Sequence, residues 1–228
     1  MQALKFAVRM VAVVSLATAG AARAAIIPLG TNSGWQAEIS DSLVGLVGLP
    51  VDAQTSTTLF IEKTAQFTSL NAIDIVFRQI APTTVNQFVI LDEAVTNQSG
   101  IAWTDFHMEI LGAAASFDPA STGASGGGGP IGFSIGPFTT ASFSNANHNL
   151  DIAGGTVPNN TTWFPGVGPG PGNGGALYFN ATPSPEEPFT VFTLREVPTV
   201  PEPGTLMFLV VGACALLRPA RSLSYPQG

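Results

Sequence analysis

The chain has 228 residues, of which only 10% are charged, and it contains 25 glycines and 18 prolines. This composition favours short strands joined by turns over amphipathic helices, whose outer faces need charged residues. Five of the eight Lys and Arg residues lie at the two ends, so residues 25–204 hold three bases against all fifteen acids. Such an acidic body repels phosphate backbones and argues against nucleic-acid binding.

Residues 1–24 have the pattern of a secretory signal peptide. Two basic residues near the start precede the apolar, small-residue stretch Met10–Ala22, and Ala22 and Ala24 satisfy the A-x-A cleavage rule. We therefore expect export through the Sec translocon and cleavage by signal peptidase, with Ala25 as the mature N-terminus. A retained membrane anchor is the alternative, but the apolar stretch is short and ends in small residues.

Residues 25–197 are predicted to form one mainly β domain, an antiparallel β-sandwich. Apolar–polar alternation and runs rich in Val, Ile, Thr and Phe recur between turn signals, and the helices that a βαβ arrangement needs are missing. The expected strands span residues 35–39, 57–67, 73–78, 85–95, 102–110, 131–135, 138–143, 176–180 and 189–196.

Two segments of this domain are dominated by glycine, Ser121–Gly129 and Gly166–Gly175. Neither segment has enough side chain to bury, because glycine contributes none. Both are predicted to be mobile surface loops.

A proline-rich spacer is predicted after the domain, at residues 198–204. Its three prolines keep the chain extended and separate the last strand of the domain from the apolar C-terminal run. Pro201, Glu202 and Pro203 form a Pro-Glu-Pro motif within this spacer.

Residues 205–217 are apolar and residues 218–228 form a tail that contains Arg218 and Arg221. As a helix the apolar run would measure about 20 Å, against about 30 Å for a hydrocarbon core. The arginines favour a transmembrane helix whose C-terminal end is cytoplasmic, and an apolar helix docked on the domain is the alternative. The lone cysteine, Cys214, lies in this run, so no intramolecular disulfide can form.

The motif, the apolar run and the basic tail together resemble the PEP-CTERM sorting domain of exported bacterial proteins, which membrane-embedded exosortases recognise. The resemblance implies that Pro201, Glu202 and Pro203 are the recognition residues and that Arg218 and Arg221 are the cytoplasmic stop. It also implies an exosortase as partner, tethering in the inner membrane with a periplasmic domain before processing, and the cell envelope or the exterior afterwards. A link to exopolysaccharide or biofilm is part of the same implication.

The segment from Asn97 to His107 reads Asn-Gln-Ser-Gly-Ile-Ala-Trp-Thr-Asp-Phe-His. The pattern Asn-x-x-Gly-x-x-Trp-Thr-Asp-Phe-His is similar to one that recurs in exported proteins with the same C-terminal signal. We expect a strand, a turn at Ser99-Gly100 and a second strand. One face of that second strand is expected to carry Trp103, Asp105, His107 and Glu109.

Asp105, His107 and Glu109 are weak candidates for metal ligands. Successive side chains on one strand face lie nearly 7 Å apart, whereas zinc sites draw converging ligands from several elements. A solvated outer face is the simpler interpretation, and we expect neither a metal nor a cofactor.

The sequence predicts no enzyme. A Ser/His/Asp triad would need His107 or His148 as its base, and no Gly-x-Ser-x-Gly elbow follows a strand. A metal-assisted hydrolase centred on His107 lacks a second element that supplies ligands.

We therefore expect an exported, non-enzymatic envelope or extracellular protein. The alternative is a carbohydrate- or matrix-binding module that stacks sugars on an exposed Trp103 or Trp163. Exposure of these two rings distinguishes the alternatives, because a buried ring offers no stacking surface.

Overall fold

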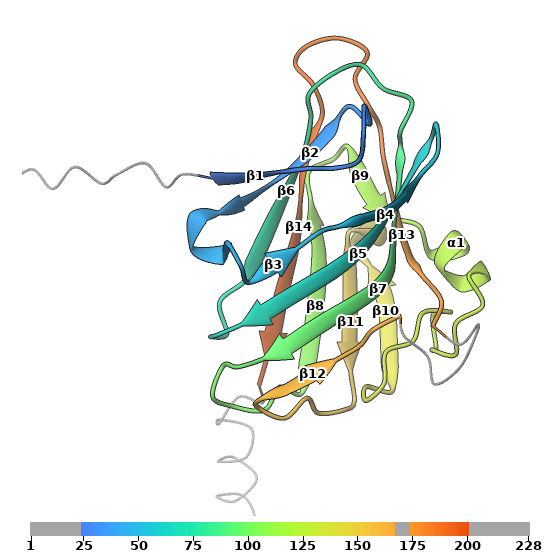
Figure 1. Ribbon diagram of the computed structural model, residues 1–228. Coiled ribbons are helices and arrows are strands. Elements are labelled where there is room, and N and C mark those ends of the chain that lie inside the picture. The colour runs from blue at the N-terminus through green and yellow to red at the C-terminus, as the bar shows by residue number, and fades with distance from the viewer. Residues whose placement is uncertain (1–23, 167–173, 201–228) are drawn as a thin grey trace, which may run out of the picture.

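The computed structural model describes residues 24–166 and 174–200, which form a sandwich of two sheets (Figure 1). Sheet A has the strand order β1-β2-β6-β14-β8-β11-β10, and sheet B has the order β3-β5-β7-β13-β9, with β4 beside β5 and β12 beside β7. The strands are β1 (Ala24–Pro28), β2 (Trp35–Ser40), β3 (Val47–Gly48), β4 (Val51–Gln54), β5 (Thr58–Phe67), β6 (Ile73–Gln79), β7 (Gln87–Asn97), β8 (Asp105–Leu111), β9 (Ala115–Phe117), β10 (Thr140–Ser144), β11 (Asn149–Ala153), β12 (Thr161–Trp163), β13 (Leu177–Ala181) and β14 (Val191–Thr199). The described helices are the short α1 (Pro119–Ala124) and the 3-10 turns η1 (Asp41–Leu43) and η2 (Asn145–Asn147).

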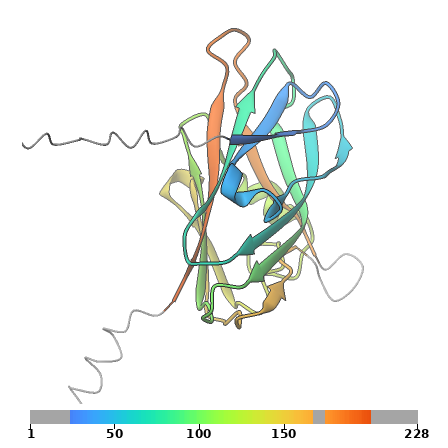
Figure 2. The same ribbon diagram turned by 60° about the vertical axis from the view of Figure 1, so that its left-hand side comes forward.

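The predicted mainly β, sandwich-like fold is confirmed. Along β2, β6 and β8 buried residues alternate with more exposed ones, because one side of sheet A packs on sheet B and the other faces water. Figure 2 shows the layers turned toward their edge. Eight of the nine expected strands overlap observed ones, whereas β1, β3, β4, β9, β11 and β12 were not predicted.

One pairing departs from the predicted antiparallel arrangement. β5 and β7 run parallel along the whole of β5, because the chain passes between them through β6 in the opposite sheet. The register shifts after the pair Ile61 and Ile90, so Leu91 is an extra residue in β7. This bulge turns Glu93 toward the core and leaves Asp92 exposed.

The glycine-rich segment Ser121–Gly129 lies at the surface as predicted, but it is not a loop throughout. Its first residues belong to α1, which Asp118 caps by accepting a hydrogen bond from the Ser121 N–H. Further along, a Cβ on Gly127 would overlap the carbonyl oxygen of Gly132. Glycine therefore serves here to let two backbone segments cross closely.

The expected strand at residues 131–135 is not formed. Gly132 has a φ of +77°, outside the extended range, and the segment makes turns and bends. The N–H of Ser134 instead donates to the carbonyl oxygen of Gly174, 2.8 Å away, and Phe133 is buried. Of the second glycine-rich segment, residues 167–173 lie outside the described part of the chain.

An aromatic cluster joins the two sheets in the core. Phe77 and Phe192 of sheet A stack with ring centroids 4.9 Å apart, and Phe88 and Phe179 of sheet B stack at 5.1 Å. Phe77 meets Phe88 edge to face at 5.3 Å. Such offset and edge-on contacts add to the burial energy of the rings, so this cluster fixes how the sheets face each other.

Candidate functional site at the end of the C-terminal strand

The last strand, β14, runs two residues further than the domain boundary predicted at residue 197. Pro198 pairs with Phe106 and Thr199 with Asp105, so both residues belong to sheet A. The N–H of Thr104 donates to the carbonyl oxygen of Thr199 at 3.0 Å. In Figure 1 this end of β14 lies at the bottom of the sandwich. The domain is therefore ordered by hydrogen bonds up to Thr199.

The turn after β7 at this end is organised by Asn97, whose side chain is fully buried. Its Nδ2 donates to the carbonyl oxygens of Ile101 (2.8 Å) and Val157 (2.9 Å). Its Oδ1 accepts from the backbone N–H and the hydroxyl of Ser99, at 3.0 and 2.8 Å. Gly100 has a φ of +90°, a backbone conformation that residues other than glycine rarely adopt. The buried Asn97 side chain therefore satisfies three backbone groups of this turn and of the neighbouring segment.

Trp103 closes this turn from the core side. Its ring is fully buried, meets Phe67 edge to face at 5.3 Å, and donates from Nε1 to Ser99 Oγ at 3.0 Å. The prediction that it shares a face with the polar residues of β8 was wrong. β8 begins only at Asp105, and the bend at Thr104 reverses which side of the chain faces inward.

The second aromatic candidate, Trp163, is also buried, with 2% exposure. It packs against Phe106 at 5.1 Å and Phe138 at 4.9 Å. Trp35 is equally buried, so all three tryptophans of the chain lie in the core. The exposed ring that the carbohydrate-binding alternative required is missing at both predicted positions.

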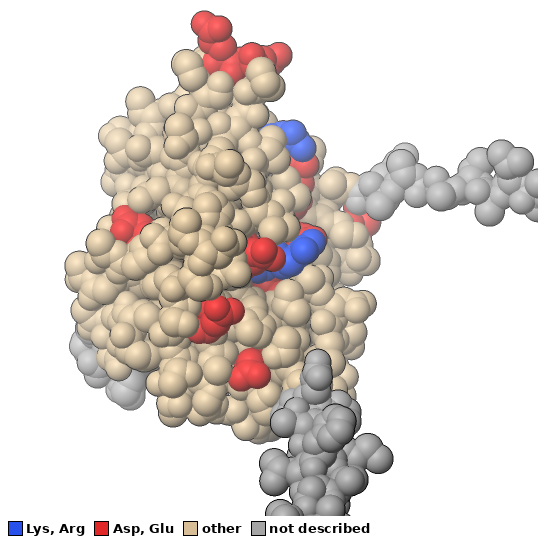
Figure 3. Space-filling view, turned by 180° about the vertical axis from the view of Figure 1, so that it is seen from behind, with Lys and Arg blue, Asp and Glu red and all other residues tan. Residues whose placement is uncertain are grey.

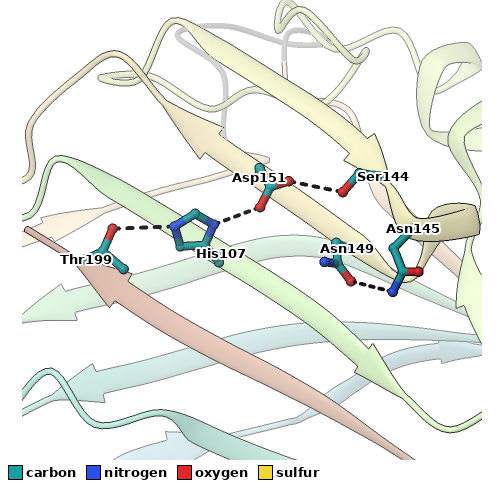
Figure 4. Close-up of polar contacts among 6 residues, drawn as sticks. All are labelled: His107, Ser144, Asn145, Asn149, Asp151 and Thr199. Carbon is teal, nitrogen blue, oxygen red and sulfur yellow. Dashed lines mark hydrogen bonds and ion pairs between the residues drawn. The ribbon is translucent and has the colours of Figure 1, made fainter.

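A row of polar side chains crosses the outer face of sheet A from Thr199 (Figure 4). Thr199 Oγ1 lies 3.4 Å from His107 Nε2, and His107 Nδ1 lies 2.8 Å from Asp151 Oδ1. Ser144 Oγ donates to the other oxygen of Asp151 at 3.2 Å. The row connects β14, β8, β11 and β10.

This row has the hydroxyl–imidazole–carboxylate order of a nucleophilic triad. Any such triad in this chain required His107 or His148 as its base, and His107 does occupy that place in the row. Its surroundings do not match that chemistry. The side chains of His107 and Asp151 are 40% and 43% exposed, so water competes for every contact. The backbone N–H groups beside them point along the sheet, where the strand ladder uses them, so none is free to stabilise an oxyanion. The row is a surface ladder that braces Thr199.

Asp105, His107 and Glu109 do share the partly exposed face of β8, as predicted. They do not converge, because His107 turns to Asp151 while Glu109 is paired in register with Arg195. Within the described residues, no group of three or more His, Cys, Asp or Glu side chains is placed to hold a metal ion.

The outer face of sheet A is acidic, and its two arginines are neutralised. Arg78 binds the carboxylate of Glu38 (2.6 and 3.2 Å), and Arg195 binds that of Asp74 (2.8 and 2.9 Å). The hydrogen bond from Arg78 also lowers the pKa of Glu38. Figure 3 shows the two basic patches bordered by acidic ones. An anionic partner therefore finds no unpaired arginine on this face.

Three buried charged residues were not predicted from the sequence: Lys63, Glu93 and Glu196. For Lys63 and Glu196 a signal was present. Each continues the apolar side of its strand at spacing two, after Leu59 and Ile61 in β5 and after Phe192 and Leu194 in β14. For Glu93 no such signal exists, because the bulge at Leu91 shifts the alternation of buried and exposed residues along β7 by one residue.

The residues of the predicted targeting segments lie mostly outside the described part of the chain. This holds for Ala22 at the cleavage site and for everything after residue 200: Pro201, Glu202, Pro203, the apolar run 205–217, Arg218 and Arg221. Ala24 and Ala25 open the edge strand β1, paired with Ser40 and Ile39. None of the helices described is long and apolar enough to cross a membrane.

A comparison with protein-family models found no match to this chain, and comparisons with curated proteins and with solved structures found none either. The residues and their contacts therefore carry the functional assignment by themselves.

Proposed function

We propose that this chain is an exported, non-enzymatic protein of the cell envelope or exterior, sorted by an exosortase through its Pro-Glu-Pro signal. Signal peptidase would release the N-terminus before Ala25. The run 205–217 would hold the protein in the inner membrane, with Arg218 and Arg221 on the cytoplasmic side and the sandwich in the periplasm. The resemblance to PEP-CTERM proteins supports this and adds a link to exopolysaccharide.

The observation that carries the proposal is the fixed end of β14. The carbonyl oxygen of Thr199 accepts a hydrogen bond from the Thr104 N–H, and the Thr199 hydroxyl lies 3.4 Å from His107 Nε2. Pro201 follows two residues later, a distance that an extended chain spans in about 7 Å. A membrane enzyme would thus meet the motif directly beside a rigid domain, in a segment whose prolines prevent it from joining the sheet.

The Asn97–His107 pattern acquires a structural explanation in this setting. Asn97, Gly100 and Trp103 build the turn that supports Thr104, and Thr104 holds Thr199. The residues that the pattern specifies therefore shape the part of the domain nearest to the sorting signal. This fits a role in presenting the signal and requires no catalysis by the pattern itself.

The charge of the domain supports the same arrangement. Its described part contains only three Lys and Arg residues, each of which is paired with a carboxylate. An acidic surface is repelled by anionic headgroups, so the domain would stay off the bilayer to which its tether holds it.

The experiment that tests the proposal replaces Glu202 in a host that contains the exosortase. We expect Glu202→Ala to be exported normally and to accumulate in the membrane as a form that keeps its C-terminal segment. Glu187→Ala is the matched control, since Glu187 also precedes a proline and is exposed in a loop of the domain. Normal maturation of Glu202→Ala, judged from the mass of its C-terminal peptide, would contradict the proposal.

Sugar binding by stacking on Trp103 or Trp163 is not supported as a second function. All three tryptophans are at most 2% exposed, and Trp103 and Trp163 are held by aromatic neighbours. A link to exopolysaccharide would have to use another contact or the sorting pathway alone.

A further inference from the structure

The core of the sandwich contains a compact cluster of three ionisable side chains. Lys63 comes from β5, Glu93 from β7 and Glu196 from β14, so the cluster spans both sheets. All three side chains have zero exposure. In the part of the chain that the structure describes, they are the only Lys, Arg, Asp or Glu residues that are buried.

The amine lies in direct contact with both carboxylates. Lys63 Nζ donates a hydrogen bond to Glu93 Oε1 and lies 2.8 Å from Glu196 Oε1. Lys63 and Glu93 are also direct partners in the parallel register of β5 and β7. The two side chains therefore extend side by side from neighbouring strands, and the bulge in β7 produces this alignment.

The surroundings of the cluster are apolar. Ile61 and Ala65 flank Lys63 along β5, and Val95 follows Glu93 on the inner side of β7. Ile73 and Met108 are the cross-strand partners of Glu196, and both are buried. Water is thus excluded from the amine and from both carboxyl groups.

As an ionic cluster this arrangement is incomplete. One ammonium faces two carboxylates, which leaves one buried negative charge. Glu93 Oε2 has no hydrogen-bond partner, and neither oxygen of Glu196 is in hydrogen-bond geometry, although Oε1 is within ion-pair distance of Lys63. Buried carboxylate oxygens without donors are costly, so a form in which one of the two carboxyl groups is protonated is favoured.

The protonation states point in the same direction. Burial raises the pKa of Glu93 to about 7, which makes this carboxyl the group most ready to hold a proton. Burial also acts to lower the pKa of Lys63, although the two carboxylates outweigh it and the pKa lies above its ordinary value. Transfer of one proton from Lys63 to Glu93 leaves the net charge unchanged. It yields a neutral amine beside a neutral acid.

We propose that Lys63 and Glu93 are joined by an intramolecular amide bond, with Glu196 as the residue that carries the proton. The geometric basis is the enclosed contact of one amine with two carboxyl groups in an apolar core. This inference concerns the folded domain and does not depend on the sorting function proposed above.

The reaction is a condensation that balances without another reactant. The neutral Lys63 amine attacks Glu93 Cδ, and a C–N bond forms in a tetrahedral intermediate. The Glu196 carboxylate takes one proton from the nitrogen and passes it to the hydroxyl that came from Glu93. The C–O bond then breaks, water leaves, and Glu196 is again a carboxylate. Three protons on the amine and the acid become one on the amide and two on water.

The structure favours Glu93 over Glu196 as the acyl partner. Glu93 is the in-register neighbour of Lys63 and accepts its hydrogen bond, whereas Glu196 reaches the amine from the opposite sheet with both oxygens otherwise unpaired. An unpaired carboxylate placed beside an attacking amine suits a proton carrier. Glu196 is therefore assigned the catalytic role.

Such a bond would serve a domain that has no disulfide. The only cysteine, Cys214, has no partner in the chain. The amide would close residues 63–93 into a ring that contains β6, and β6 belongs to the opposite sheet. One covalent bond would thus restrain the separation of both sheets.

The test is the mass of the purified full chain, denatured and reduced. We expect a mass lower by one water than the sequence requires for the termini found by peptide mapping. Trypsin provides a second readout, because it cannot cleave after an acylated lysine. The cross-linked protein should yield the segment ending at Arg78 joined to residues 79–195, with no cleavage after Lys63.

Two variants separate the roles of the residues. Lys63→Met removes the nucleophile, and Glu196→Gln retains both bonding partners and the shape of the third side chain. We expect both to show the full sequence mass, and Glu196→Gln to regain trypsin cleavage after Lys63. Glu62→Gln, on the exposed side of the same strand, should remain cross-linked.

A wild-type protein with the full sequence mass and free cleavage after Lys63 would overturn the proposal, whether or not the variants fold. Complete cross-linking in Glu196→Gln would overturn the role of Glu196. A bond found between Lys63 and Glu196 would overturn the choice of acyl partner.

Discussion

The N–H of Thr104 and the carbonyl oxygen of Thr199 are joined by a 3.0 Å hydrogen bond that connects the turn after β7 with the last residue of β14. The buried side chains of Asn97 and Trp103 hold the turn that contains Thr104, and this hydrogen bond links that turn to Thr199 at the C-terminal end of the domain. Changes at these core positions should therefore affect both the stability of the domain and the order of its C-terminal end.

Asn97→Ala should lower the free energy of unfolding by about 2–3 kcal/mol, because it removes the four side-chain hydrogen bonds with which Asn97 holds Ser99, Ile101 and Val157. Urea denaturation of the two proteins measures this. Gln98→Ala, at the exposed neighbouring position, should change stability by less than about 0.5 kcal/mol. Equal effects at the two positions would show that Asn97 does not organise the turn.

Trp103→Ala should lower the free energy of unfolding by about 3–5 kcal/mol, the range for truncation of a large buried aromatic side chain. Urea denaturation measures this difference as well.

In the wild type, acrylamide should quench tryptophan emission weakly until the protein unfolds, because all three tryptophan rings are buried. Strong quenching of the native state would show that at least one tryptophan ring is exposed to solvent. That result would support the alternative in which sugars stack on an exposed tryptophan.

The pair of Glu38 and Arg78 predicts an acid-side loss of stability. Its hydrogen bond lowers the pKa of Glu38 in the folded state, so the pair stabilises the protein above the ordinary glutamate pKa of about 4.3. This contribution is lost as the pH falls through the lowered pKa. Wild type should therefore be more stable than Glu38→Gln at pH 7, and the difference should shrink near pH 3. A difference that is the same at both pH values would contradict this.

The proposed amide predicts a larger effect than an ion pair would give. A cross-link that closes a loop of the size of residues 63–93 stabilises by about 3–4 kcal/mol in the chain-entropy account. Glu196→Gln should therefore unfold at a lower urea concentration than Glu62→Gln, which keeps the bond. If Glu196→Gln proves as stable as the control while its mass shows no cross-link, the bond contributes nothing to the fold.

Apolar–polar alternation along the chain was enough to predict the strands β2, β6 and β14, because each of them buries one face. The alternation gave the wrong buried face where a bend or a bulge in the backbone shifts the pattern by one residue. The bend at Thr104 turns Trp103 inward, and the bulge at Leu91 does the same for Glu93. Neither feature has a residue signature as clear as Gly132, whose positive φ replaces an expected strand with turns.

The candidate site was predicted in part. His107, Asp105 and Glu109 do share a face of β8, but the partners that define the row, Asp151 and Thr199, lie 44 and 92 residues away from His107. Local pattern cannot supply such pairings, because they depend on the order of strands in the sheet. The buried position of Lys63 was within reach of the period-two pattern, whereas its partners required the three-dimensional fold.

Processing of the C-terminal signal by an exosortase is the central proposal for this chain. The measurement that tests it most directly is the identity of the last residue of the exported protein, by mass spectrometry, in matched hosts with and without the exosortase. We predict loss of the segment that contains residues 205–217 only when the enzyme is present. An identical C-terminus in the two hosts would contradict the proposal.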